Sequence, residues 1–518
     1  MKNNYRYESD WSPYVFARQE ANFTPSDEIK EKFTKVSFVD THIPAGGLPV
    51  ICDGETGYLN TETEMTLIYG ETGSKKSRTL IAPLVANLAK AGEGMVLFDI
   101  KGEFSTGKLS PYIRGVLEEC GYRCIFLDFR NLQSDSYNIL EYPYKLYHSG
   151  KKDEAMGQVS HIAHALSSIY EGSKADPFWE ISARQYIICI IMLVIRYCPN
   201  PDKLNFLSIA TYSDEKNCEI MKKAADIIKA NDNIGTMLKN VLSSPERTLA
   251  SILVTVSSFL EVFISNENLL KMTSSTTFAI GDLYERKTAI FVIVPDEIKT
   301  YDRICGIILN QISATLVGDA YRYGGELPRR VNFICDEFCN YYVPNMERSI
   351  SAHRSRNIRW YLVCQSKRQL EKVYEREADT ITANCANTYF LNSSEMALLE
   401  HLSARAGQTT VTENGFSKPL ISVQDLQSLK KGWEYTETYF SSKDIHFVTK
   451  LPDIGMYGYL KRHEGKKYGL PKSPRPAVKT YTAEEMLDDI KTKPKRSSEY
   501  DLQKELEAKF DEIFGKPN

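Results

Sequence analysis

The feature that most restricts the fold of this chain is an eight-residue loop between an apolar strand and a helix. The run 65–69 predicts a buried strand, and residues 77–90 predict an apolar helix. The loop between them consists of Gly70, Glu71, Thr72, Gly73, Ser74, Lys75, Lys76 and Ser77. This context is that of a Walker A loop, where backbone N–H groups and the helix dipole attract phosphates. We therefore expect ATP and Mg²⁺ here, with Lys76 on the β- and γ-phosphates and the Ser77 hydroxyl on the metal.

One residue departs from the Walker A pattern, because Lys75 stands where that pattern has its second glycine. Glycine there allows the backbone an open conformation close to the phosphates, which a side chain can obstruct. Two interpretations stay open. Either Lys75 points outward and adds positive charge near the nucleotide, or nucleotide binding is weakened or lost. We take retained ATP binding as the expectation.

Two adjacent carboxylates, Asp336 and Glu337, follow an apolar run at 331–335 that predicts a strand. Neighbouring side chains at a strand end point in different directions, so these two groups can divide the work. We expect Asp336 to hold Mg²⁺ and Glu337 to orient and deprotonate the attacking water. Many strands end in acidic turns, so it is the combination with the loop at 70–77 that predicts an ATPase.

Short apolar strands alternate with helical patterns on both sides of a purely helical stretch, which predicts an α/β fold with an all-α insert. Further strands are expected at 94–99, 123–128, 288–294 and 360–364. The expected limits are an N-terminal extension at 1–45, a nucleotide-binding domain at 46–150 and 276–470, an all-helical domain at 151–275, and a basic linker with a tail helix at 471–518.

Cysteine content, net charge and hydropathy restrict the cellular location and the kind of protein that this chain can be. The 11 cysteines form no short-spaced metal set, which indicates reduced thiols and a cytoplasmic location. The net charge of −3 does not by itself indicate a nucleic-acid binder, although a local basic surface stays compatible with it. The most apolar run, 186–195, is shorter than the about 20 residues that a bilayer core requires. We expect a buried helix there and no transmembrane segment.

Several elements in a fixed order resemble the TraG-type coupling proteins of conjugation and type IV secretion. They are Asp99-Ile-Lys-Gly-Glu103, Asp176-Pro-Phe-Trp179, Cys335-Asp-Glu-Phe-Cys-Asn340, His353-Arg-Ser-Arg-Asn357 and Val363-Cys-Gln-Ser366. The resemblance covers about residues 46–400, and the sequence departs from the family pattern at Lys75, Ile100, Cys339 and Val85. It implies a RecA-like P-loop nucleotide-binding domain interrupted by an all-α domain.

The resemblance also implies roles for residues beyond the two motifs. Arg354 corresponds to an arginine finger that reaches the γ-phosphate of a neighbouring subunit, with Arg356 as the alternative. Gln365 would sense the γ-phosphate by hydrogen bonding. Asp99 and Lys101 are expected near the nucleotide without a firm role.

For the whole molecule, the resemblance implies a homo-hexameric ring that hydrolyses ATP to pass single-stranded DNA, a relaxase or an effector protein to a type IV secretion channel. Family members are commonly anchored by N-terminal transmembrane helices, and residues 1–45 contain no such span. We therefore expect a peripheral position at the cytoplasmic face of the membrane, reached through a membrane-anchored partner.

Two other functions stay open. A degenerate Walker A loop fits a substrate-docking platform that does not hydrolyse ATP. A duplex-DNA translocase of the FtsK/HerA type would use the same loop without a secretion channel. The elements around Asp336, Arg354 and Gln365 favour the coupling family over FtsK.

Overall fold

The computed structural model describes residues 5–7, 15–18, 23–167, 177–228, 232–410, 417–442 and 445–492. The chain divides into two compact units. The sheet unit comprises residues 1–137 and 276–475, and the helical unit comprises residues 138–275 and 476–518. The helical unit starts at Asn138, before the expected limit at 151, because helix α4 (Glu141–His148) packs on other helices of this unit.

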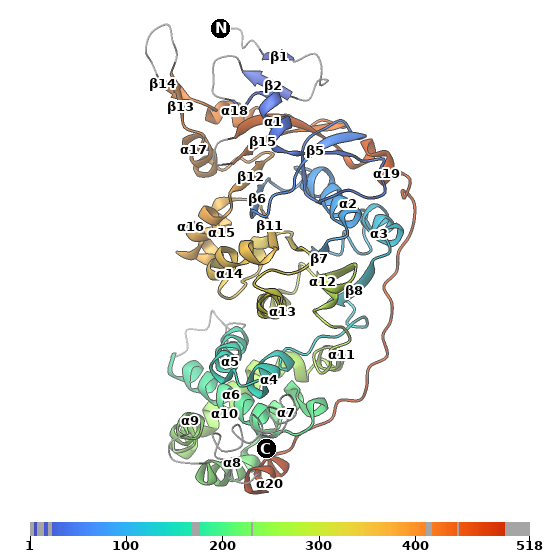
Figure 1. The fold of residues 1–518 in the computed structure, drawn as a ribbon. Helices are drawn as coiled ribbons and strands as arrows, with labels where there is room; N and C mark the ends of the chain where they lie inside the picture. The colour runs from blue at the N-terminus through green and yellow to red at the C-terminus, as the bar shows by residue number, and fades with distance from the viewer. Residues whose placement is uncertain are drawn as a thin grey trace, which may run out of the picture. The chain divides into compact units, whose positions relative to one another are not determined.

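Within the described residues, the sheet unit contains an 11-stranded sheet (Figure 1). Its order is β1 (Tyr5–Tyr7), β2 (Val15–Arg18), β16 (His446–Pro452), β15 (Tyr435–Ser441), β12 (Asn387–Phe390), β6 (Thr66–Tyr69), β11 (Ile358–Cys364), β10 (Val331–Cys335), β7 (Gly94–Ile100), β9 (Thr288–Val294) and β8 (Arg123–Asp128). Neighbours from β12 to β8 pair in parallel, and the strands beyond β12 are antiparallel. The strands predicted from the sequence are present, with limits that differ by at most two residues.

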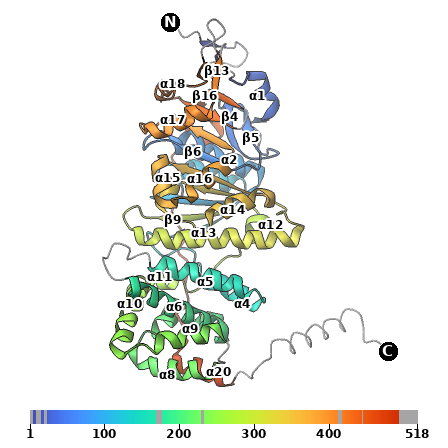
Figure 2. The ribbon, with the colours of Figure 1, turned by 90° about the vertical axis from the view of Figure 1, so that its left-hand side faces the viewer.

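Helices cover both faces of the parallel part of the sheet (Figures 1 and 2). One face carries α2 (Ala82–Ala91) and α3 (Ser110–Glu119), and the other carries α13 (Lys299–Ala320), α14 (Met346–His353), α15 (Lys367–Tyr374) and α16 (Glu377–Asn384). Strands that are covered on both sides need apolar residues at every position. This explains why β7, β9, β10 and β11 are buried along their whole length.

Part of the N-terminal extension expected at 1–45 belongs to the sheet unit. Helix α1 (Ser26–Lys32) leads into a three-stranded sheet of β3 (Thr34–Ser37), β5 (Thr56–Asn60) and β4 (Leu48–Cys52). Ile29 and Val36 belong to the same buried cluster as the apolar residues of α2. Residues 26–37 are therefore part of the sheet unit rather than a separate extension.

The helical unit is organised around α6 (Pro177–Tyr197), whose neighbours in the packing are α5 (Lys152–Ser167), α9 (Asn233–Leu242) and α10 (Glu246–Ile264). The unit also contains α7 (Phe206–Thr211), α8 (Glu215–Ile227), α11 (Glu267–Met272) and α20 (Ala483–Thr492). Helix α20 packs on α8 with Met486 and Ile490 buried, in a segment where the sequence predicted a linker. The tail helix predicted near residues 502–513 lies outside the described residues.

Among the described residues, three helical stretches have the length and composition of a membrane span: Pro177–Tyr197, Glu246–Ile264 and Tyr301–Tyr323. The apolar windows of these stretches are 61%, 39% and 72% buried inside the structure. The short run at 186–195 is thus part of a 21-residue helix, so length does not exclude a span. What argues against lipid contact for α6 is its packing within the helical unit, and the absence of a transmembrane segment stays a prediction.

A buried histidine connects α14 with β11. His353 Nδ1 accepts a hydrogen bond of 2.8 Å from Trp360 Nε1, and the two rings stack 5.9 Å apart. Burial, with a smaller contribution from Arg356, lowers the pKa of His353 from 6.5 to about 3. The folded chain therefore keeps this imidazole neutral under conditions in which an unfolded chain protonates it.

We expect the free energy of unfolding to fall by about 2 kcal/mol between pH 6.5 and pH 5 through His353 alone, because each pH unit below the unfolded pKa costs about 1.4 kcal/mol. The contribution is complete above pH 6.5 and is lost as the pH falls toward 3. Urea unfolding of the full chain at both pH values checks this. The loss should be smaller in His353→Gln and unchanged in His42→Gln, since His42 is exposed. Equal pH dependence in all three proteins would contradict the assignment.

Candidate nucleotide-binding and catalytic site

Three adjacent parallel strands bring several of the predicted site residues to the same end of the sheet. Strand β11 lies between β6 and β10, so Gly70, Gln365 and Asp336 follow strand ends that point the same way. Gln365 Nε2 donates a hydrogen bond of 2.6 Å to Glu337 Oε2. Ligands of open α/β sheets bind at such carboxyl ends. The geometry therefore groups the loop at 70–77 with Asp336, Glu337 and Gln365.

The loop is anchored to the two strands beside β6. Gly70 N–H donates to the carbonyl of Cys364 at 3.1 Å, and Glu71 N–H donates to the carbonyl of Asn392 at 3.2 Å. The Glu71 carboxylate accepts hydrogen bonds from the hydroxyl and the N–H of Ser394, which hold the pKa of Glu71 below its ordinary value. These contacts fix the loop in place before any ligand binds.

Polar groups inside the loop fit a phosphate-bearing ligand. Lys76 is almost completely buried, and its Nζ donates to the carbonyls of Gly70 and, at 3.2 Å, Glu71. The Ser74 hydroxyl is buried and has no hydrogen-bond partner among the described residues. Buried polar groups in proteins are normally paired. A group that supplies acceptor oxygens here would satisfy Ser74 and would give Lys76 a negatively charged partner.

Lys75 has the backbone conformation of a glycine and a side chain that leaves the loop. Its φ of 71° lies in the left-handed region, which costs a non-glycine residue about 1 kcal/mol. Lys75 Nζ donates to the carbonyls of Gly432 at 2.8 Å and Trp433 at 3.2 Å, and lies 3.5 Å from Asp453 Oδ2. Lys75 therefore adopts a left-handed backbone conformation that glycine reaches without this cost, and its side chain points outward.

Asp453 was not identified from the sequence, yet it links the loop to the end of β16. It accepts a hydrogen bond of 2.9 Å from Arg78 Nε and a second one from the same guanidinium. Burial raises the pKa of Asp453, but the bonds from Arg78 and from the Gly455 N–H outweigh it and hold the pKa below the ordinary value. The partners are 375 positions apart, so no local pattern could have indicated the pair.

Asp336, the first of the two carboxylates after β10, lies in a region that disfavours its negative charge. Burial and the neighbouring Glu337 raise the pKa of Asp336 to about 7, and Lys76 acts in the opposite direction. Glu337 has a positive φ of 48°, and its N–H donates to Asp336 Oδ1 at 3.1 Å. A nearby cation stabilises the ionised form of such a buried carboxylate. In the part of the chain that the structure describes, no group of three or more His, Cys, Asp or Glu forms a metal site by itself.

Asp99 and Lys101 have structural contacts after β7. The Asp99 carboxylate is completely buried and accepts hydrogen bonds from the N–H groups of Phe104 at 3.0 Å and Ser105 at 2.9 Å. Burial raises the pKa of Asp99 to about 6 despite these bonds. Lys101 pairs with Asp296 at 3.2 Å. These contacts shape the turn that follows the strand.

The two arginines of the Arg-Ser-Arg element are not brought to this site. Both precede β11, so they lie at the amino-terminal edge of the sheet, where Arg354 pairs with Glu64 at 3.3 Å. Arg356 donates to the Tyr321 hydroxyl at 2.8 Å and lies over its ring at 4.9 Å. The length of β11, about 20 Å at 3.3 Å per residue, separates them from Glu337 of the same chain.

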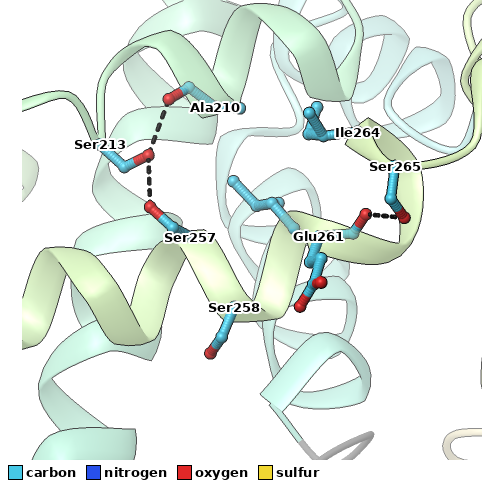
Figure 3. Close-up of a pocket in the computed structure, with 8 residues that line it drawn as sticks. Ala210, Ser213, Ser257, Ser258, Glu261, Ile264 and Ser265 are labelled. Atoms are coloured by element: carbon cyan, nitrogen blue, oxygen red, sulfur yellow. Dashed lines mark hydrogen bonds between the residues drawn. The ribbon is translucent and has the colours of Figure 1, made fainter.

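A separate pocket of about 540 Å³ lies in the helical unit between α7 and α10 (Figure 3). It is lined mainly by small and hydroxylated side chains: Ala210, Ser213, Ser257, Ser258, Leu260, Glu261, Ile264 and Ser265. Ser213 donates to the Ala210 carbonyl, Ser257 to Ser213, and Ser265 to the Glu261 carbonyl. These three hydroxyl groups therefore donate hydrogen bonds to other residues of the helical unit.

Comparison with known proteins identifies relatives of this chain. The family model described as type IV secretory system conjugative DNA transfer matches residues 23–437. The conjugal transfer protein TraG of Escherichia coli is 24% identical over 387 residues, which are 70% of this chain and 58% of TraG. An uncharacterised protein of Bacillus anthracis is 44% identical over 50 residues, which are 10% of this chain and 18% of that protein. The chain thus spans less than two thirds of the length of these relatives.

Solved structures of the bacterial conjugative coupling protein TrwB share the fold. The form lacking the N-terminal segment, in complex with sulphate, has a TM-score of 0.56 at 14% identity and covers 87% of this chain and 97% of that one. The complex of TrwB with a non-hydrolysable ATP analogue has a TM-score of 0.54 at 14% identity, over 86% and 95% of the two chains. This likeness confirms the predicted RecA-like α/β fold with an all-α insert. Because the family model covers most of its length, the chain belongs to the type IV secretory system conjugative DNA transfer family, as a TraG-type coupling protein.

Proposed function

We propose that this chain is an ATP-driven motor that recruits single-stranded DNA, a relaxase or an effector protein and moves it to a type IV secretion channel. The observation that carries the proposal is that the loop at 70–77, Asp336, Glu337 and Gln365 lie together at the carboxyl ends of three adjacent parallel strands. Membership of the conjugative DNA transfer family supports the kind of cargo. The TrwB complexes with an ATP analogue and with ADP and Mg²⁺ support the kind of ligand.

In this proposal each site residue has a defined task. The loop N–H groups and Lys76 bind the phosphates, while Ser77 and Asp336 hold Mg²⁺. Bound Mg²⁺ neutralises phosphate charge. Glu337 orients a water molecule and takes its proton, and Gln365 fixes the Glu337 carboxylate through the 2.6 Å hydrogen bond.

Assembly and recruitment are parts of the same proposal. Arg354 lies at the opposite sheet edge from Glu337, so it serves a γ-phosphate only across a subunit contact, as in a homo-hexamer. Recruitment to the cytoplasmic face of the membrane would use a membrane-anchored channel component.

A docking platform without turnover is the second candidate, and Lys75 is the observation that favours it. The Lys75 side chain points away from the loop, however, and this supports retained nucleotide binding. Lys75→Gly separates the two, because glycine adopts the same φ without strain. At saturating ATP, a motor should keep its turnover within about threefold in this variant, whereas a gain of about 100-fold would identify Lys75 as the block to hydrolysis.

Steady-state ATP turnover of the full chain, with and without single-stranded DNA, tests the proposal. We expect turnover that rises with DNA and is lost in Lys76→Ala. The change Lys216→Ala, at an exposed lysine of the helical unit, should leave it unchanged. Wild-type turnover no higher than that of Lys76→Ala, at concentrations that permit ring assembly, would contradict the motor.

A further inference from the structure

An almost fully exposed tryptophan stands beside the loop at 70–77. Trp433 is 93% exposed, the largest value among the exposed large hydrophobic side chains that the structure describes. It lies in a tight turn closed by the bridge between Lys431 and Thr436 and by the hydrogen bond from Gly432 N–H to the Tyr435 carbonyl at 2.8 Å. Tryptophan normally buries a large apolar area. An ordered turn that leaves this ring in solvent is therefore suited to a partner that covers it.

The turn is tied to the loop through the residue that departs from the Walker A pattern. Lys75 Nζ donates to the carbonyls of Gly432 and Trp433 and lies 5.7 Å from the centre of the Trp433 ring. The same ammonium group lies 3.5 Å from Asp453, which is also paired with Arg78 at the start of the following helix. The position of the ring relative to the loop is thus set by contacts on two sides.

Lysine side chains lie close to both the Trp433 turn and the loop. An ideal Cβ at Gly73 would lie 3.8 Å from Lys431 Nζ, so Lys431 reaches the loop from the same turn. Lys76 and Lys431 together suit an anionic ligand at the loop, whereas the ammonium group of Lys75 is turned outward to Asp453. An aromatic face next to this cluster suits a ligand that carries a planar ring at one end and phosphates at the other.

We propose that Trp433 is the stacking surface for the base of the nucleotide held at the loop, with Lys75 as the residue that positions it. The inference rests on the proposed nucleotide-binding function and adds the subsite for the base. Stacking on an aromatic face tolerates any purine because each presents a π-face. Adenine and guanine nucleotides are therefore bound with similar affinity at this subsite.

The test compares a ligand with a base and one without. Equilibrium binding of ATP and of inorganic tripolyphosphate, each with Mg²⁺, is measured on the full-length wild type, Trp433→Ala and Trp433→Phe. Loss of the stacking contact between the ring and the base should weaken ATP binding about tenfold in Trp433→Ala, whereas tripolyphosphate binding should change less than about twofold. Trp433→Phe keeps an aromatic face and should recover most of the ATP affinity.

Fluorescence gives a second readout. ATP, but not tripolyphosphate, should quench the emission of the wild type, and Trp433→Phe should remove that quenching while Trp179→Phe, in the helical unit, keeps it. Equal weakening of both ligands in Trp433→Ala, or no weakening, would overturn the stacking proposal while leaving nucleotide binding intact. A change in assembly state without a change in the ratio of the two affinities would also overturn it and assign Trp433 to a contact between chains. If the wild type bound neither ligand, the proposed function itself would fail.

Discussion

Replacing Glu337 by glutamine is expected to lower ATP turnover about 10³-fold while nucleotide affinity changes little. General-base catalysis contributes about 10²- to 10⁴-fold in enzymes, and an amide cannot take the proton of the attacking water. Glutamine has nearly the same size, and its amide oxygen can accept the 2.6 Å hydrogen bond from Gln365. Single-turnover kinetics and equilibrium binding, measured on the same preparation, separate the loss of chemistry from a loss of binding.

Two further variants make the Glu337 experiment specific. Glu326→Gln removes an exposed carboxylate from the sheet unit and should leave turnover unchanged. Gln365→Ala frees the Glu337 side chain without removing its charge, so we expect a loss of about tenfold in turnover and none in affinity. A Glu337→Gln protein that keeps more than a tenth of the wild-type turnover would show that another group takes the proton.

The parts of the site that could be predicted are those that depend on local sequence. Strands β6 and β10 are short apolar runs, and each is followed directly by its polar residues, the loop at 70–77 and the pair Asp336 and Glu337. Strand pairing is not local. The position of β11 between β6 and β10 brings Gln365 to Glu337, and the spacing of these residues along the chain does not contain that information.

The conformation of Lys75 depended on contacts that lie far away in the sequence. The loop pattern alone left open whether the side chain obstructs the phosphates or points outward. The side chain of Lys75 is held outward by hydrogen bonds to the carbonyls of Gly432 and Trp433 and by its contact with Asp453, all more than 350 positions away. Helix α20 was missed for a different reason. It is a ten-residue helix whose burial depends on a neighbour, α8, that local periodicity does not reveal.

Arg354→Ala is expected to lower turnover about 10³-fold, and Arg356→Ala no more than about threefold, because an arginine finger contributes about 10³- to 10⁵-fold in related phosphoryl-transfer enzymes. The side chain of Arg354 is 64% exposed, and the ion pair that it makes within the described residues, with Glu64 at 3.3 Å, is one that a neighbouring chain can displace. Arg356 is held by Tyr321 through a hydrogen bond and a ring contact. Turnover at saturating ATP, with nucleotide affinity as the control, distinguishes the two arginines.

Mixing two inactive proteins decides whether Arg354 acts on its own chain or on a neighbour. Glu337 follows the carboxyl end of β10, and Arg354 precedes the amino end of the adjacent strand β11. An active site between chains therefore takes Glu337 from one chain and Arg354 from the next. Chains carrying Arg354→Ala keep Glu337, and chains carrying Glu337→Gln keep Arg354. In a randomly mixed ring at equal amounts, about a quarter of the contacts unite both intact groups, so turnover should reappear at a comparable fraction of wild type. If Arg354 served its own chain, no mixture would contain an intact site and turnover would stay at the level of the separate variants.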